Sequence, residues 1–413
     1  MFKKFALFIF RCNLKGEWLG RLTYGPTDEG LLRTDESLLA QDDPHHHDGV
    51  SPLLTLDTKL KTQCPLEPMH LLFLGVTRRI YAHLLTKKKS RSKLRIPLVL
   101  ELSAYLVSLA PYFPSEFARK PRSLFEWKLF KATEFRRLLF YDGFLLFKSM
   151  KNKGLWEIHC LLSCACRILC DTNLLKEYWT DAEQLLRKFV KKSCKLFGQT
   201  FNVFNVHSLT HLAAECALHG ALDDFSAWKY ESYLGQLKKL LHAPGRSLQQ
   251  IVCRLKERIA ILGEREQVSA VPILEQPHSR GPILGLGEQY HKLKMSNMTL
   301  RISVNDACVI TNNNSVVVVR NIVKTSCGIE LVGNEFQHEA SYFSYPFPSE
   351  ILGIKKVQKL GDLKRWLLSE IKQKAVLLPL NNPAPRNPSH HWMDSIECLC
   401  LPMLHYSENQ SVV

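Results

Sequence analysis

The sequence lacks long hydrophobic runs. No stretch of its 413 residues approaches the ~20 consecutive apolar residues that a membrane-spanning helix needs, so no membrane partner is expected. The first ten residues, MFKKFALFIF, place two lysines before a short apolar run. Because Arg11 follows at once and no small-residue cleavage site is present, this start predicts a strand or a buried edge rather than a signal peptide. There is also no internal repeat.

A regular cysteine framework is also missing, and acidic residues are fewer than basic ones. The 13 cysteines are odd in number and irregularly spaced, which excludes a disulfide scaffold and indicates a reduced, intracellular protein. There are 55 Lys and Arg against 39 Asp and Glu, a formal net charge of +16. This surplus favours a partner with a phosphate backbone or an anionic surface. The alternative is a solvated basic surface with no dedicated partner.

The hydrophobic pattern divides the chain into several regions. Residues 1–66 are irregular, and residues 67–262 show mainly helical spacing. Asp181 is expected to cap a helix over residues 181–196. The clearest amphipathic helix is expected over residues 226–242, with tyrosines and leucines on one face and Glu231 on the polar face.

After residue 262 the pattern changes. Proline and glycine over residues 263–298 predict a linker. Residues 299–380 predict a small β-rich domain. Its first two strands are expected over 300–310 and 315–322, joined by a turn at 311–314. Further strand character is expected at 328–332 and 342–345, and one helix at 362–374. Proline in residues 381–413 predicts an extended or disordered tail.

Several short blocks occur in an order that resembles one family. They are Leu32-Arg-Thr-Asp-Glu-Ser37, Pro65-Leu-Glu-Pro-Met-His70, Asn205-Val-His-Ser-Leu-Thr-His211, Phe225-Ser-Ala-Trp-Lys-Tyr-Glu-Ser-Tyr-Leu-Gly-Gln-Leu-Lys-Lys239 and Tyr345-Pro-Phe-Pro-Ser349. The ordered set resembles the transposase domain of CACTA-like elements and spans nearly the whole chain. The resemblance implies an RNase H-like DDE enzyme, in which three carboxylates hold two magnesium ions for phosphoryl transfer.

The resemblance assigns two candidate catalytic and metal-binding carboxylates, Glu67 and Glu231. The sequence departs from the family at the first two of its three catalytic carboxylates. The first catalytic aspartate of the family precedes the region that matches Cys12, so this chain is expected to begin too late to contain it. Glu67 stands where the family usually has aspartate, which moves the carboxylate outward by one methylene, and it precedes Pro68. Glu231 matches the helix-borne glutamate of the family. The alternatives are a glutamate at a helix N-terminus and a solvent-facing residue.

Zinc is not expected. The family's Cys-x-x-Cys pair survives here only as Cys12, because Ile9 occupies the first position. His207 and His211 are four residues apart, a spacing that can hold zinc or a phosphate on one helix face, or that can belong to core-facing structural histidines. The cysteines of residues 160–170 are expected to be small buried residues rather than metal ligands.

Basic residues form several clusters that predict contacts with a DNA backbone. The candidate DNA-binding residues are Lys87, Lys88, Lys89, Arg91, Lys238, Lys239 and Arg254. A further row, Arg187 to Lys195, recurs along one helix. The run over residues 87–95 has the alternative readings of a solvated loop or a nuclear-import signal.

These observations predict an α/β, mainly helical protein: an incomplete RNase H-like core with a large helical insertion, followed by the small β-rich domain. The expected function is that of a transposon-derived protein that no longer catalyses transposition, binds no magnesium now and retains DNA-backbone binding, in the nucleus. A second copy is a candidate partner, because an incomplete core leaves sheet edges uncovered. The alternatives are a helical protein-interaction module, and an active metal-dependent transposase whose upstream segment is missing from the sequence.

Overall fold

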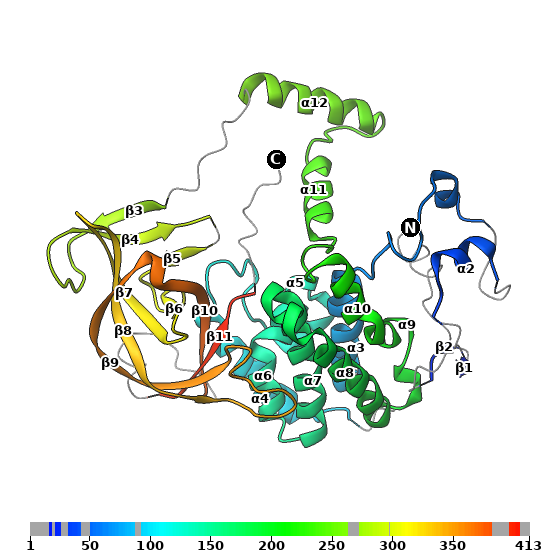
Figure 1. Ribbon diagram of the computed structural model, residues 1–413, viewed down its shortest axis with the longest axis horizontal. Helices are drawn as coiled ribbons and strands as arrows, with labels where there is room; N and C mark the ends of the chain where they lie inside the picture. Colours follow the sequence, from blue (N-terminus) through cyan, green and yellow to red (C-terminus); the bar gives the residue numbers. More distant parts are fainter. Residues whose placement is uncertain are drawn as a thin grey trace. The chain divides into compact units, whose positions relative to one another are not determined.

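The computed structural model describes residues 16–18, 21–25, 32–42, 50–86, 92–262, 272–296, 298–381 and 396–404. The protein is of the α/β class, with many helices and a large antiparallel sheet (Figure 1). It divides into two compact units. The first contains Met1–Val107, Arg122–Ser226 and Ser344–Pro348, and the second contains Ser108–Pro121, Ala227–Phe343 and Ser349–Val413.

The first unit is built from helices and one short hairpin. The hairpin pairs β1 (Gly16–Trp18) with β2 (Arg21–Thr23). The helices in chain order are α2 (Asp35–Ala40), η2 (Pro52–Leu56), η3 (Met69–Thr77), α3 (Arg78–Leu85), α4 (Ile96–Ser108), η5 (Leu124–Leu129), α5 (Ala132–Phe140), α6 (Asp142–Ser149), α7 (Lys153–Cys170), α8 (Thr172–Phe197), η6 (Gln199–Phe201), α9 (Phe204–His207) and α10 (Leu209–His219).

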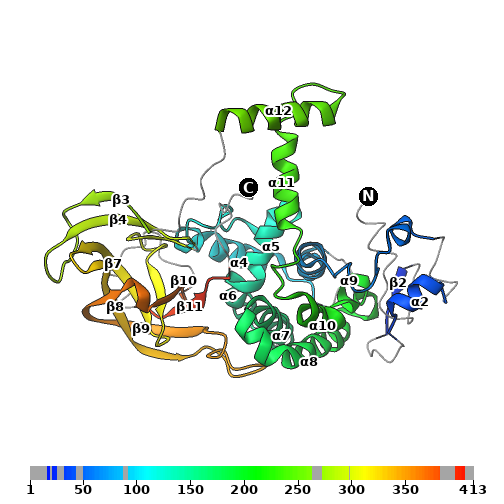
Figure 2. The same cartoon turned by 45° about the horizontal axis from the view of Figure 1, so that its top comes forward.

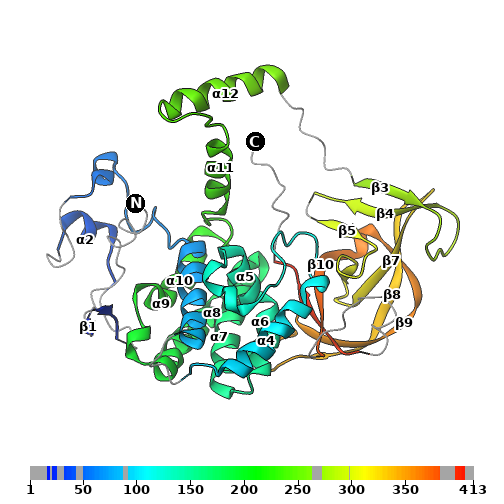
Figure 3. The same ribbon diagram turned by 180° about the vertical axis from the view of Figure 1, so that it is seen from behind.

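Helix α7 lies at the centre of this unit, beside α8 (Figure 3). From Ile158 to Leu169 every residue of α7 is buried, which is the pattern of a helix covered on all sides. Cys160, Cys164 and Cys166 are therefore core residues, as the sequence predicted, and Cys170 at the end of the helix is half-buried. Burial raises the pKa of the Cys170 thiol to about 12, so this thiol is protonated at neutral pH.

Most of the second unit is a closed β-barrel. Its strands are β3 (Ile273–His278), β4 (Glu288–Lys294), β5 (Thr299–Arg301), β6 (Cys308–Thr311), β7 (Val316–Thr325), β8 (Gly328–Ser341), β9 (Lys355–Leu367), β10 (Ile371–Pro379) and β11 (Cys398–Pro402), with the short helices η4 (Ala110–Tyr112) and η7 (Leu368–Glu370). The order β7-β6-β10-β11-β9-β8 returns to β7, because β8 also pairs with β7. All pairings in this ring are antiparallel, and closure leaves the ring without a free edge. β3, β4 and β5 extend the sheet from β7 (Figure 1).

Strands β6 and β11, and β10 from Lys374 onward, are buried on both faces. One face lines the barrel interior. The other face of β10 carries Lys374, whose side chain meets Glu116 from the segment 108–121. Phe113 and Phe117 of this segment are buried and touch edge to face. The second unit is therefore assembled from segments far apart in the sequence.

The remainder of the second unit consists of α11 (Trp228–Lys238) and α12 (Ser247–Leu262), which follow one another around a tight corner (Figure 2). No residue of α11 is buried, and none is buried in α12 from Ser247 to Ala260. The predicted amphipathic helix therefore exists, but its tyrosines and leucines are not packed into a core.

Several predictions at the level of elements were wrong. Residues 362–374 form the end of β9, η7 and the start of β10, because pairing with β8 and β6 outweighs the helical spacing of their apolar residues. The predicted linker contains β3 and β4, and the predicted tail contains β11, which lies between β10 and β9. Residues 342–345 are not a strand. Asp181 lies inside α8, which begins after its cap Asp171 and changes direction at Tyr178.

Candidate functional site

Glu67 lies at the start of η3, where its carboxylate caps the helix. Oε1 accepts the backbone N–H of Met69 at 2.8 Å, and Oε2 accepts that of His70 at 2.8 Å. The His70 ring nitrogen Nδ1 lies 2.7 Å from Oε2, and the Ser226 hydroxyl donates to Oε1 at 3.4 Å. Both oxygens therefore satisfy donors within the protein. This geometry is that of a helix cap, the alternative that the sequence offered for Glu67.

The second candidate carboxylate, Glu231, is an exposed residue in the first turn of α11. Glu67 belongs to the first unit and Glu231 to the second. Among the residues that the structure describes, no group of three or more His, Cys, Asp or Glu side chains could hold a metal ion.

The two candidate histidines lie together in the first unit. His207 ends α9 and His211 lies in the first turn of α10, and their rings meet edge to face with centroids 5.4 Å apart. His207 also stacks on Tyr24 at 4.2 Å. Both histidines are buried, at 5% and 9% exposure. Aromatic contact and burial favour the structural reading over a zinc or phosphate site.

Two ion pairs that no sequence pattern indicated fix the interior of the first unit. Arg136 binds both oxygens of Asp223, at 2.6 and 2.8 Å. Burial by itself would lower the pKa of the Arg136 guanidinium. The attraction of Asp223 and its hydrogen bonds outweigh this effect, so the pKa is raised. Arg137 Nε donates to Asp142 at 2.7 Å, with side chains only 1% and 0% exposed. Burial raises the pKa of Asp142 despite this arginine.

The predicted basic clusters fall in different places. Lys87, Lys88, Lys89 and Arg91 lie outside the described residues. On α8, Lys188, Lys191 and Lys195 are exposed along one face, whereas Lys192 pairs with Glu157. The candidates of α11 and α12, by contrast, come together in one place.

A groove of about 480 Å³ lies between α11 and α12. Its lining residues are Gln236, Lys239, Leu240, Arg254, Glu257 and Arg258. Three basic side chains and one acidic side chain thus line the groove, and the acid, Glu257, is paired with Arg254 at 2.7 Å. Lys238 is the last residue of α11, next to the groove residue Lys239.

The corner between these helices is held by the amide of Gln250. Its Oε1 accepts the backbone N–H groups of His242 and Ala243, at 3.0 and 3.3 Å. Its Nε2 donates to the carbonyl oxygens of Ala243 and Gly245, at 2.9 and 2.7 Å. Gly245 has a φ of 83°, which glycine adopts without strain. Specific bonds from Gln250 of α12 therefore hold the corner residues 242–245.

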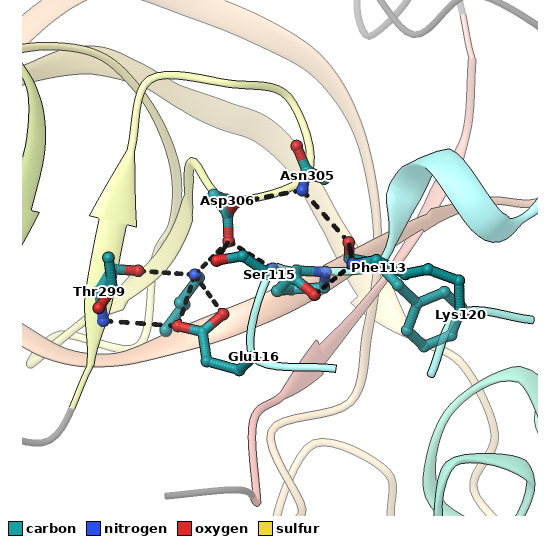
Figure 4. A network of polar contacts seen from close by, with 9 residues as sticks. Phe113, Ser115, Glu116, Lys120, Thr299, Asn305 and Asp306 are labelled. Carbon is teal, nitrogen blue, oxygen red and sulfur yellow. Dashed lines mark hydrogen bonds and ion pairs between the residues drawn. The ribbon is translucent and has the colours of Figure 1, made fainter. Parts of the chain in front are cut away.

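A buried polar network occupies the outer face of β10 (Figure 4). Lys374 Nζ donates to Asp306 Oδ1 at 2.6 Å, to both oxygens of Glu116 at 2.8 Å and to the carbonyl of Thr299 at 2.7 Å. Ser115 donates to the same Asp306 oxygen. Because these residues are up to 258 positions apart, no sequence spacing could have indicated the cluster.

Comparison with known proteins reaches only part of the chain. Residues 277–389 match a family described as a domain of unknown function, DUF8592. The match covers the barrel from the end of β3 to β10, and leaves out β11 and the segment 108–121. No curated protein and no solved structure matches the chain. In the described residues, no helix is long and apolar enough to cross a bilayer.

Proposed function

We propose that this protein binds the phosphate backbone of DNA through the groove between α11 and α12, without cutting it. The observation that carries the proposal is the convergence of Lys239, Arg254 and Arg258 on one exposed groove. Guanidinium and ammonium groups neutralise phosphates and release counterions, which supplies sequence-independent affinity. Lys238, at the end of α11, adds to the same positive field.

We further propose that the protein derives from a CACTA-like transposase, that its first unit derives from an RNase H-like core, and that it works in the nucleus. The support is the ordered set of motifs along the chain. The absence of cutting is supported by Glu67, whose carboxylate oxygens are engaged in capping η3.

The test is the affinity of the whole chain for a fluorescein-labelled DNA duplex of mixed sequence, measured by anisotropy. Replacing Lys239, Arg254 and Arg258 by Ala should weaken binding by on the order of 100-fold at ~0.15 M salt, since three counterion-releasing contacts are lost. The matched control replaces three exposed lysines of the barrel, Lys324, Lys364 and Lys372, which changes the net charge equally. Equal losses in both variants would contradict the assignment of the groove.

A protein-interaction role is the second candidate, and exposed apolar side chains favour it. Tyr230 is 70% exposed, Leu234 50%, Leu248 75% and Ile259 69%. Helices of this length are marginal in water unless an apolar face is covered. Under this reading the chain shows no salt-dependent DNA binding, and replacing the groove residues changes nothing in the anisotropy assay.

Retained catalysis is tested separately. If the chain is an active DDE enzyme, magnesium should support nicking of a supercoiled plasmid, and Glu231→Gln should abolish it. The proposal expects binding without nicking, both with and without magnesium. Nicking that is lost in Glu231→Gln would overturn the non-cutting part of the proposal and leave the binding part standing.

A further inference from the structure

The network around Lys374 places an amine against a carboxyl group in a dry environment. The Lys374, Asp306 and Glu116 side chains are 2%, 2% and 5% exposed. Lys374 lies on β10, and Asp306 lies two residues before β6, which is the antiparallel neighbour of β10. Lys374 is paired in register with Val309, so the backbone holds the two side chains together. Such fixed proximity removes a large part of the entropic barrier to joining two groups.

Two carboxylates surround one ammonium group, so the cluster holds an excess negative charge away from water. Burial opposes the charge of Asp306, but Lys374 and the Ser115 donors outweigh it and keep the pKa of Asp306 below its ordinary value. The resting proton is therefore on the lysine. Glu116 contacts the same Nζ through both oxygens and is placed to carry this proton.

We propose that Lys374 and Asp306 form an intramolecular amide bond, with Glu116 as the proton carrier. One proton first passes from the ammonium group of Lys374 to Oδ2 of Asp306, which gives a neutral amine and a protonated carboxyl group. Nζ then attacks Cγ, the Nζ–Cγ bond forms, and the Cγ–Oδ2 bond breaks. Glu116 takes a proton from Nζ and returns one to the departing Oδ2, which leaves as water. The reaction is a dehydration without change of oxidation state, so it needs neither oxidant nor reductant.

The other contacts of Asp306 fit this reaction. Ser115 donates its backbone N–H and its hydroxyl to Oδ1, at 2.9 and 3.1 Å. These two donors face the oxygen on which negative charge develops in the tetrahedral intermediate, as in an oxyanion hole. Asn305 Nδ2 donates to Oδ2, the leaving oxygen, at 3.1 Å (Figure 4). The amide would covalently join β10 to the chain just before β6.

The experiment is the intact mass of the purified, folded whole chain under denaturing conditions. The expected mass lies below the sequence mass by one water, about 18 Da, and proteolysis should release a branched peptide that contains Lys374 and Asp306. Glu116→Gln and Lys374→Arg should both restore the full sequence mass. The control Glu397→Gln removes an exposed partner of Lys356 and should keep the shift.

A wild-type chain that is folded by circular dichroism and keeps its full sequence mass would overturn the proposal, whatever the variants do. A shift that persists in Glu116→Gln would overturn the role of Glu116. A mass deficit of one water that persists in Lys374→Arg would show that the water is lost at another position, and would overturn the assigned bond.

Discussion

Replacing Asp142 with Leu should destabilise the first unit by about 3–5 kcal/mol, because it removes the carboxyl group that accepts a hydrogen bond from the buried guanidinium of Arg137. Asp142 and Arg137 are 0% and 1% exposed, so water cannot take the place of the lost partner. For a unit of this size, that loss corresponds to a fall in Tm of about 6–20 °C. Urea unfolding followed by circular dichroism measures it.

The pair also makes a prediction about pH. Burial raises the pKa of Asp142 above that of the unfolded chain, so its contribution to stability is full at low pH and is lost as the pH rises through the folded pKa. Asp142→Asn should remove this component of the pH dependence. The double variant Arg137→Met with Asp142→Leu should recover most of the stability, because it removes both charges.

The matched control is Glu183→Gln, which breaks the exposed pair with Arg187 on α8. This control substitution should lower the free energy of unfolding by less than about 1 kcal/mol. If Asp142→Leu lowers the free energy of unfolding by no more than this control does, the account of a buried and structurally required pair is refuted.

Three further outcomes follow from the geometry. Gly143→Ala should lower the free energy of unfolding by about 1–3 kcal/mol or more, because a Cβ at this position would overlap the carbonyl oxygen of Leu138. Thermal unfolding measures this loss, and an unchanged Tm would contradict it. Hydrogen bonds from Lys292 and Lys294 lower the pKa of Glu275 to about 2. The stability that these bonds contribute is therefore present above the ordinary glutamate pKa and is lost as the pH falls towards 2. An NMR titration that gives Glu275 an ordinary glutamate pKa would refute this. Deleting residues 396–404 removes β11 and opens the barrel. The shortened protein should therefore lose protection of the barrel amides from hydrogen exchange. Retained protection would show that the barrel strands are stable without a closed ring.

Local patterns were sufficient for elements that follow their own periodicity. Helical spacing predicted the helices near residues 70–85, 96–109 and 155–170, and β-branched residues predicted the hairpin of β6 and β7. The burial of Cys160, Cys164 and Cys166 was predicted because cysteines at these positions lie on opposed faces of one helix and cannot converge on a metal ion. In these cases the sequence neighbours decide the structure.

Elements that depend on distant partners were not predictable in this way. Residues 362–374 show helical spacing, yet strand pairing sets their structure. Prolines near β3 and β11 suggested a linker and a tail, because the sequence does not show that both strands join one sheet. The same holds for the segment 108–121 and the Lys374 network, which only the folded chain assembles.

The candidate site was predicted in part. Lys239 and Arg254 were expected to contact DNA, and the structure places both at one groove. The sequence did not indicate that Gln250 fixes the corner between the helices. It assigned Glu67 to a catalytic site, whereas the alternative of a residue at a helix N-terminus describes its actual bonds.

The slope of log affinity against log salt for duplex DNA tests the central claim most directly. Wild type and the barrel-lysine control should share one steep negative slope, and the variant lacking Lys239, Arg254 and Arg258 should have a slope smaller in magnitude by about 3. Identical slopes in all three proteins would contradict DNA-backbone binding at the groove between α11 and α12.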